Sequence, residues 1–309
     1  MFKTLTPPEM LCITDSTYRE DSLCYIRDII DSLHTKRLAV HIDLSQIKYA
    51  SAAASVLLFA VLNRAYFVIG QRLRVRFTFP KKETNPQGHR CIVRTGLARA
   101  LVANTHEKLD ALVQQERYFQ SSVTPELALS TTMTMLQKAA VLDETQATLL
   151  MMGMNEAMLN VRNHAYEHDF YTKGVELMGG KRWWQCAWFD PEQDRVVFII
   201  CDLGMGIAQS YQGEEIDSVA QFILEQNLVS EALTSGRSRF REPNRGNGSE
   251  DIKRPIALGT TKYEKLMVFS GGSLYEMDSD LSETRARIDT LRPRIPGTII
   301  LWALTPNRG

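Results

Sequence analysis

The alternation of strand-like and helix-like patterns in the first eighty residues is the strongest constraint on the fold. The segment "RLAVHIDLS", Arg37 to Ser45, is almost continuously apolar and rich in β-forming residues. The next segment, "AAASVLLFAVLNRAYFVIG", has the pattern of a helix that ends at Gly70. It is followed by "RLRVRFTFP", which alternates apolar and basic residues until Pro80. Strand, helix and strand in this order predict a β-α-β unit within an α/β fold.

A second block follows a polar segment, "THEKLDALVQQERYFQSSVTPEL", which has the composition of a linker or a connecting helix. We place the boundary near residue 115, which gives predicted domains of residues 1–115 and 116–309. The second block opens with helical sequence from Pro125 to about Tyr166, interrupted at "VLDET", where Asp143 is suited to cap a new helix. A helix near "IDSVAQFILEQNLVSEAL" is expected further on.

The remaining apolar segments of the second block predict strands. "KRWWQCAWFD" and "RVVFIICDLG", joined by "PEQD", have the pattern of a hairpin whose second strand ends at a glycine-rich corner. "KLMVFSGGSLYEM" predicts a second hairpin that turns at Gly271 and Gly272. A charged excursion, "DSDLSETRARIDTLRPRIP", then separates this hairpin from a last strand, "GTIILWAL".

Composition narrows the classes of protein to be considered. The chain has 309 residues, and 36 Lys and Arg balance 36 Asp and Glu, so no overall charge favours nucleic acid or an anionic membrane. The five cysteines are scattered without metal-binding spacing, which indicates reduced thiols. The amino terminus lacks the apolar core of a signal peptide, and we read no apolar run as long enough to span a membrane. These features predict a cytoplasmic protein.

The helix "MNEAMLNVRNHAY", Met154 to Tyr166, is unusually polar for its apolar surroundings. Glu156, Asn160 and Asn163 are spaced four and three residues apart, which places them on one side of a helix. Such a stripe is usually a solvated face, but here apolar residues flank it on both sides. Asp202, in "DLGMG", follows a strand with a buried pattern, where a carboxylate needs a hydrogen-bond partner. A ligand would supply one.

Four motifs of this block resemble those of the GHKL ATPases, which include gyrase B, the large heat-shock chaperones, sensor histidine kinases and MutL. "NEAMLNVRNHA" resembles the N-box, "DLGMG" the DxGxG motif, "RGNGSEDI" the second glycine box and "PGTIILWAL" the terminal Gly-Thr strand. They occur in the order of the family over roughly Pro125 to Leu304. The resemblance implies a Bergerat α/β sandwich, with helices on one face of a mixed sheet.

The resemblance also implies roles for individual residues. Asn160 would bind Mg²⁺, a hard cation that prefers oxygen ligands, and Glu156 would be the general base that polarises the attacking water. Asp202 would accept a hydrogen bond from the adenine amino group, and Asn163 would assist the metal site or contact phosphate. The other implied contacts to the nucleotide come from Gly204 and Gly206 beneath the base, Gly246 and Gly248 at the phosphates, and Thr298 in the adenine pocket. We interpret His164 as a structural residue at the helix end.

The arginine-rich segment before the second glycine box corresponds to the ATP lid of the family. Arg245 is our first candidate for a contact with the γ-phosphate, ahead of Arg237, Arg239 and Arg241. The chain departs from the family at Ser249, where a small apolar residue is usual. It also lacks an obvious phosphate-sensing lysine, so the resemblance supports ATP binding more firmly than hydrolysis.

The amino-terminal segment "LAVHIDLSQIKYASAAASVLLFAVLNRA" resembles a STAS domain, the fold of bacterial anti-sigma-factor antagonists. In that family a phosphorylatable serine stands at the start of the helix. The equivalent stretch here is "SAAA", Ser51 to Ala54, which puts an alanine at the phosphoacceptor position. A generic α/β module with no shared function would give the same hydrophobic pattern.

The leading hypothesis is an ATP-dependent switch that acts on a protein partner or within a homodimer, in signalling, stress response or phage defence. One alternative is a protein kinase of the anti-sigma-factor type, which would transfer the γ-phosphate to a serine of another protein. A histidine kinase would use His106, but the proline and the dimerisation hairpin of that family are missing, and Thr105 suits His106 to a solvated first helical turn. A non-catalytic interaction module and a DNA-processing ATPase are weaker alternatives.

Overall fold

The computed structural model describes residues 2–139, 142–190, 192–212, 221–234, 248–257, 263–279 and 284–307. The elements up to residue 139 are β1 (Lys3–Leu5), β2 (Met10–Leu11), α1 (Ser16–Ile30), β3 (Val40–Asp43), β4 (Tyr49–Ala50), α2 (Ala52–Ile69), β5 (Val75–Thr78), α3 (Pro86–His89), α4 (Leu97–Leu101), α5 (His106–Gln114), β6 (Phe119–Ser122) and α6 (Pro125–Ala139). Those that follow are α7 (Glu144–Asn160), α8 (Thr172–Leu177), β7 (Trp183–Asp190), β8 (Arg195–Asp202), α9 (Ile207–Gln212), α10 (Gln221–Thr234), α11 (Gly248–Ala257), β9 (Glu264–Ser270), β10 (Ser273–Ser279), β11 (Thr284–Thr290) and β12 (Thr298–Leu304). Short π-helical or 3-10 turns extend several helices, at Asp31–Thr35, Gly70–Arg72, Arg90–Arg94, Val161–Ala165 and Asp169–Tyr171.

The amino-terminal block contains the predicted β-α-β unit. Strands β3 and β5 pair in parallel, with β1 parallel on the other side of β3, and α2 connects the two predicted strands. Ser51 caps α2, since its side chain accepts a hydrogen bond from the Ala54 amide at 3.3 Å. The helix ends where predicted, at Gly70, whose φ of 64° lies in the left-handed region that glycine tolerates.

The second block is built on a seven-stranded sheet in the order β11-β10-β9-β12-β8-β7-β6. The mixed α/β class is confirmed, and both predicted hairpins, β7–β8 and β9–β10, are present. The expectation of a mixed sheet is wrong, because all six neighbouring pairs of strands are antiparallel. Two of the pairs are tight hairpins, and a short turn can join only antiparallel neighbours.

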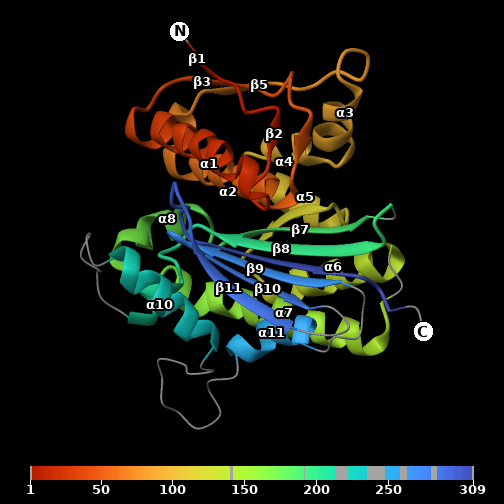
Figure 1. Cartoon of the computed structure of the whole chain (residues 1–309). Helices are drawn as coiled ribbons and strands as arrows, with labels where there is room; N and C mark the ends of the chain where they lie inside the picture. The colour runs from red at the N-terminus through yellow and green to blue at the C-terminus, as the bar shows by residue number, and fades with distance from the viewer. Residues whose placement is uncertain are drawn as a thin grey trace.

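Four layers are stacked in the molecule, as Figure 1 shows: the small parallel sheet, then α1 and α2, then the large sheet, then the helices α6, α7, α10 and α11. Successive tryptophans in β7 point to opposite faces of the large sheet, as strand geometry requires. Trp184 donates a hydrogen bond from its indole to Asn63 of α2, whereas the Trp183 indole donates to Gln185, which in turn contacts α6 through Thr132. The large sheet is therefore covered on both faces, with α2 of the amino-terminal block packed against β7 and β8.

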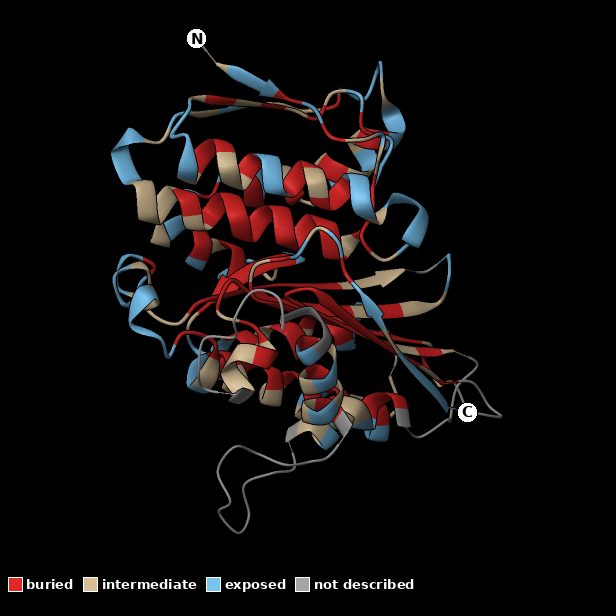
Figure 2. Ribbon diagram, turned by 60° about the vertical axis from the view of Figure 1, so that its left-hand side comes forward, coloured by how far each residue is buried: buried red, intermediate tan, exposed pale blue. Residues whose placement is uncertain are grey.

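Helix α2 is long and strongly apolar. Together with the turn after it, Ala52–Arg72, it is long and apolar enough to cross a membrane, so the expectation that no segment reaches this length is wrong. In the structure two thirds of its apolar window are buried inside the protein, and Figure 2 shows the helix beside the large sheet coloured mostly as buried. It is a core helix between two sheets.

Two strands of the large sheet were not predicted. Strand β6 lies in the segment expected to be a linker or a helix, and β11 lies in the charged excursion. The side chains of β6 are polar but buried, and Ser121 donates to the Trp183 carbonyl of the neighbouring strand at 2.7 Å. Strand β11 is an exposed edge strand, where charged side chains are usual, and Arg287 pairs across the strands with Glu276.

Candidate functional site

Asp202, the last residue of β8, lies beside the last strand of the chain. Thr298 is directly opposite it in the β8–β12 pairing, and the Thr298 hydroxyl lies 3.3 Å from that of Ser270 at the end of β9. The strand ends of β8, β9 and β12 therefore meet at one point. The structure thus brings together two predicted site residues, Asp202 and Thr298, that are almost one hundred residues apart in the sequence.

The Asp202 carboxyl group is buried, with only 6% of the residue exposed. Burial raises its pKa to about 7, although the main-chain N–H groups of Gly204 and Thr298 act in the opposite direction. The Gly204 amide donates to Asp202 Oδ1 at 2.8 Å. A further donor, such as an amino group of a ligand, would reduce the free-energy cost of keeping this carboxylate charged.

Gly204 and Gly206 are both required by the fold of the "DLGMG" loop. A Cβ on Gly204 would lie 2.0 Å from the Ala165 carbonyl oxygen, and the Met205 amide donates to this oxygen at 2.9 Å. Gly206 has a φ of 82°, and the next amide, that of Ile207, donates to Ser270 Oγ at 2.8 Å. The loop is therefore fixed against both the helical segment that follows Asn160 and the end of β9.

Helix α7 presents Glu156 and Asn160 together, as their four-residue spacing predicts. Asp143 caps the helix, accepting a hydrogen bond from the Gln146 amide at 2.7 Å, which confirms the predicted start. The Glu156 carboxyl group is half-buried and accepts a hydrogen bond from the Asn160 side chain. Burial raises the pKa of Glu156, the nearby Asp251 carboxylate raises it further, and the bond to Asn160 opposes the shift. A carboxyl group with a raised pKa is suited to accept a proton near neutral pH.

The helix changes its geometry immediately after Asn160. Val161–Ala165 form a π-helical turn, which carries more residues per turn than an α-helix. Asn163 lies in this turn and is exposed. His164 lies 4.0 Å from the Glu167 carboxylate, as a side chain at a helix end would.

Helix α11 begins at Gly248 and packs against α7. A Cβ on Gly153 of α7 would meet the Asp251 carbonyl oxygen at 3.1 Å, so the two helices cross closely there. The first turn of α11 contains Glu250 and Asp251, acidic residues that would oppose a phosphate unless a cation lay between them. Arg245 and Gly246, with Arg237, Arg239 and Arg241, lie outside the described residues.

Three residues that support the site were not predicted: Arg64, Tyr166 and Ser270. The Tyr166 hydroxyl accepts a hydrogen bond from the Leu203 amide at 3.1 Å and donates to the Arg182 carbonyl at 2.7 Å. Tyr166 directly follows the N-box pattern, which is the one signal in the sequence that could have indicated it. Arg64 and Ser270 act through contacts between distant segments, which the sequence does not reveal.

His106 is more constrained than a solvated helical residue. Its ring stacks on that of Phe67, with centroids 4.3 Å apart, and its Nδ1 lies 3.3 Å from an Arg182 Nη2. Thr105 caps α5 as predicted. One ring nitrogen of His106 is thus occupied within the protein, which disfavours a role in phosphate transfer.

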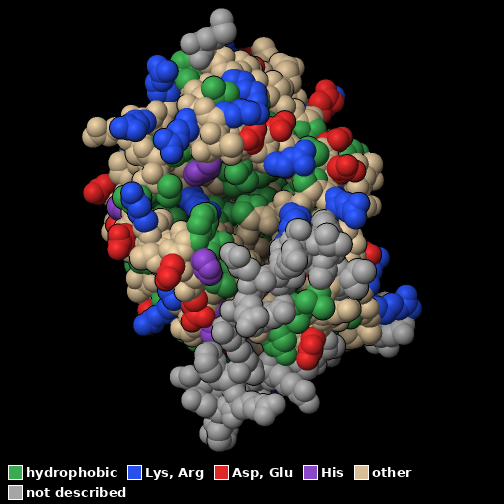
Figure 3. Space-filling view, turned by 90° about the vertical axis from the view of Figure 1, so that its left-hand side faces the viewer, with side chains coloured by type: hydrophobic (Ala, Val, Ile, Leu, Met, Phe, Trp, Pro, Cys, Tyr) green, Lys and Arg blue, Asp and Glu red, His purple; other side chains and the backbone are tan. Residues whose placement is uncertain are grey.

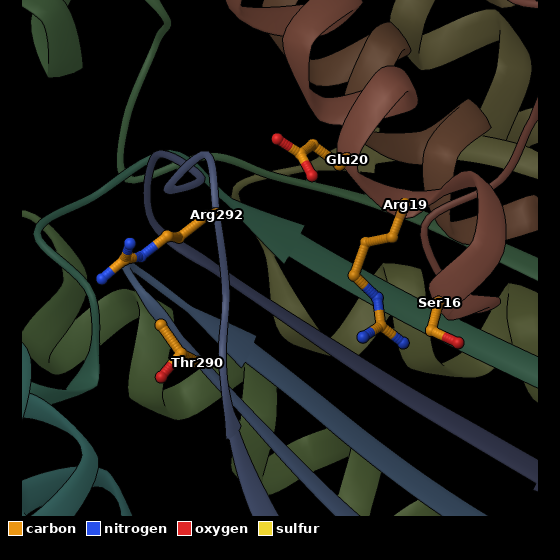
Figure 4. A pocket seen from close by; sticks show the side chains of 5 residues that line it. All are labelled: Ser16, Arg19, Glu20, Thr290 and Arg292. Carbon is orange, nitrogen blue, oxygen red and sulfur yellow. The ribbon is translucent and has the colours of Figure 1, made fainter.

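No group of three or more His, Cys, Asp or Glu side chains among the described residues is placed to hold a metal ion. Figure 3 shows a face whose centre is hollowed and lined with hydrophobic side chains, with Lys and Arg around its upper part. An open cavity of about 300 Å³ lies between α1 and the end of β11. Its lining residues, shown in Figure 4, are Ser16, Arg19, Glu20, Thr290 and Arg292, none of which was predicted to bind a ligand.

Comparison with models of known protein families gives no match, and no curated protein sequence matches this chain either. The assignment of a function therefore depends on the geometry around Asp202 and Glu156.

Proposed function

We propose that this protein binds Mg-ATP through a GHKL-type domain in residues 116–309 and uses the nucleotide as a conformational or interaction switch. The observation that carries the proposal is the position of Asp202. Its buried carboxyl group lies beside Thr298 at the strand ends, and its loop contacts the π-helical turn, Val161–Ala165, that directly follows Asn160. A carboxylate that lacks solvent and is followed by a glycine-rich loop is suited to accept a hydrogen bond from an adenine amino group.

Each part of the site would then have a separate role. Asp202 and Thr298 would bind the base, while Gly248 at the start of α11 would offer main-chain N–H groups to the phosphates, together with Gly246 and Arg245. Mg²⁺ would neutralise phosphate charge, with the Asn160 side-chain oxygen as its protein ligand. Glu156, which is held by Asn160 and has a raised pKa, would accept the proton of the attacking water.

The amino-terminal block would be a STAS-like domain that transmits the state of the site to a partner protein or to a second copy of the chain. Its three parallel strands and the α2 helix that begins after Ser51 are compatible with that fold. The described residues contain five free cysteines and no disulfide, as expected for the cytoplasmic location that belongs to this proposal.

Substitutions on α7 test the assignment of the base and of the metal ligand. Glu156→Ala should retain Mg-ATP binding in calorimetry but lower ATP turnover by at least roughly 100-fold, because it removes the proton acceptor. Asn160→Ala should weaken binding only when Mg²⁺ is present. Glu144→Ala, on the exposed first turn of the same helix, is the matched control and should change neither quantity. Turnover by Glu156→Ala at the wild-type rate would refute the assignment of the base.

The fate of the γ-phosphate separates the switch from a serine kinase. With γ-labelled ATP, release of the label as inorganic phosphate supports the switch, and transfer of the label to a protein supports the kinase. A non-hydrolysable ATP analogue that alters neither oligomer size nor partner capture would count against the switch.

A further inference from the structure

Arg64 of α2 reaches out of the amino-terminal block to the "DLGMG" loop. Its Nη1 donates a hydrogen bond to the Leu203 carbonyl at 3.2 Å, and its guanidinium carbon lies 6.0 Å from the centre of the Tyr171 ring. The Leu203 carbonyl belongs to the residue directly after Asp202. A side chain from residues 1–115 therefore holds the loop of the candidate adenine site.

The Leu203 amide is held by a second side chain, that of Tyr166. Its N–H donates to the Tyr166 hydroxyl at 3.1 Å, and the Tyr166 and Tyr171 rings pack edge to face with their centroids 5.7 Å apart. Both polar groups of Leu203 are thus fixed by side chains, one from α2 and one from the end of the N-box segment. Removing either side chain would leave a polar main-chain group of a buried residue without that partner.

The burial of part of the Arg64 side chain lowers the stability of the fold. Its Nε is buried and has no hydrogen-bond partner among the described residues. Burial of the His34 ring lowers the pKa of His34, and the positive charge of Arg64 lowers it further. An apolar side chain at this position would avoid the cost of burying a polar group. If residue 64 only had to fill space, an arginine would not be needed.

We propose that Arg64 is a positioning residue of the nucleotide site and couples the amino-terminal block to the orientation of Asp202. The inference rests on the proposed function. A hydrogen bond to the Leu203 carbonyl restricts the rotation of the Leu203–Gly204 peptide, whose Gly204 N–H donates to Asp202 Oδ1. Small displacements of a recognition group cause large losses of affinity. Because coupling between sites is reciprocal, a partner that shifts α2 would change nucleotide affinity, and the nucleotide would change partner affinity by the same factor.

Binding of two probes to three variants tests the inference. Arg64→Met keeps the length and the apolar stem but removes the donors, and Arg64→Lys restores a single charged donor. Arg19→Met is the matched control, because Arg19 also donates to main-chain carbonyls, those of Ile13 and Thr14, away from the site. Affinity for ADP and for inorganic triphosphate, both with Mg²⁺, is measured by calorimetry, and folding is checked by thermal unfolding.

We expect Arg64→Met to weaken ADP binding roughly tenfold and to leave triphosphate binding unchanged, since Arg64 acts on the base end of the site. Arg64→Lys should recover part of the loss, and Arg19→Met should bind both probes as the wild type does. Equal ADP affinity in Arg64→Met and the wild type, or an equal loss for both probes, would overturn the inference while the proposed function stands. A wild-type chain that binds no ADP would overturn both.

Discussion

The carboxyl group of Asp202 is buried, and keeping it charged costs free energy. Its two main-chain donors do not compensate fully for its burial, and its pKa is consequently raised to about 7. The protein therefore holds a group whose charge changes near neutral pH at the position where the base is proposed to bind. Such a group is destabilising when ionised in the empty site and is stabilised by a donor.

The pH dependence of stability should reveal this cost. A carboxyl group whose folded-state pKa is raised stabilises the protein fully below its unfolded pKa of about 3.9, and this contribution is lost as the pH rises through about 7. Relative to Asp202→Asn, which cannot ionise, the wild type should lose a few kcal/mol of unfolding free energy between pH 4 and pH 8. Urea unfolding of both proteins across this range measures the difference. If the difference in unfolding free energy between the two proteins did not vary with pH, the raised pKa of Asp202 would be contradicted.

At the residue scale, the sequence predicted the site where chemistry and spacing are local. The spacing of Glu156 and Asn160 and the position of Asp202 at a strand end follow from helix and strand geometry. The exposure of Asn163 did not follow, because the π-helical turn after Asn160 is set by tertiary contacts such as that between Ala165 and Met205. Arg64 was not predicted either, because its contact with Leu203 joins segments that are far apart in the sequence.

At the scale of elements, α10 is fixed to the large sheet by an ion pair whose carboxylate is buried. Glu225 of α10 is 4% exposed, and its Oε1 accepts hydrogen bonds from Arg294 Nη2 at 2.9 Å and from the Gly272 amide at 3.1 Å. Gly272 lies in the turn between β9 and β10, and Arg294 precedes β12. One carboxylate therefore joins a helix, a hairpin turn and a connecting loop.

Removal of the cation should destabilise this junction. Arg294→Met leaves Glu225 buried with less compensation, and we expect the unfolding free energy to fall by about 2 kcal/mol. Lys36→Met removes the exposed ion pair between Lys36 and Asp31 and should lower the unfolding free energy much less, because solvent screens this pair. Chemical denaturation of both variants measures the contrast. Equal effects would mean that burial does not strengthen the Glu225 pair.

The strands of the large sheet that were predicted have a clear apolar pattern, and the two that were missed, β6 and β11, lack one. The β7–β8 and β9–β10 hairpins combine apolar strands with short turns, which specify antiparallel pairing locally. Strand β6 reads as polar because its buried side chains, such as Gln120 and Ser121, have hydrogen-bond partners inside the protein. The sequence of β11 resembles a loop because edge strands often carry charged residues.

At the scale of the whole molecule, α2 belongs to two cores at once. Its residues pack in one continuous hydrophobic cluster that includes side chains of both blocks, and Asn63 bonds to Trp184 across the layers. The predicted boundary near residue 115 falls between α5 and β6, where the chain passes into the large sheet. Packing of α2 on the large sheet could not be predicted, because α2 is apolar on all sides and its pattern indicates no preferred face.

A fragment of residues 116–309 should therefore behave differently from the full chain. Without α2, the faces of β7 and β8, including Trp184, would be exposed to water. We expect the fragment to bind a hydrophobic dye strongly and to elute as an aggregate in size-exclusion chromatography, with the full chain as the control. A monomeric fragment that binds no dye would instead support two domains with separate cores.

The position of α2 in the chain has a consequence for how the protein is made. About 110 residues separate the end of α2 from the start of β7, so at ordinary rates of synthesis roughly 6 to 20 s pass before its partner strand leaves the ribosome. During that interval the small parallel sheet and α1 cover one side of α2, and the other side has no native partner. The nascent chain thus carries a segment with the length and apolarity of a membrane span, and only the later half of the protein gives it a place in the interior.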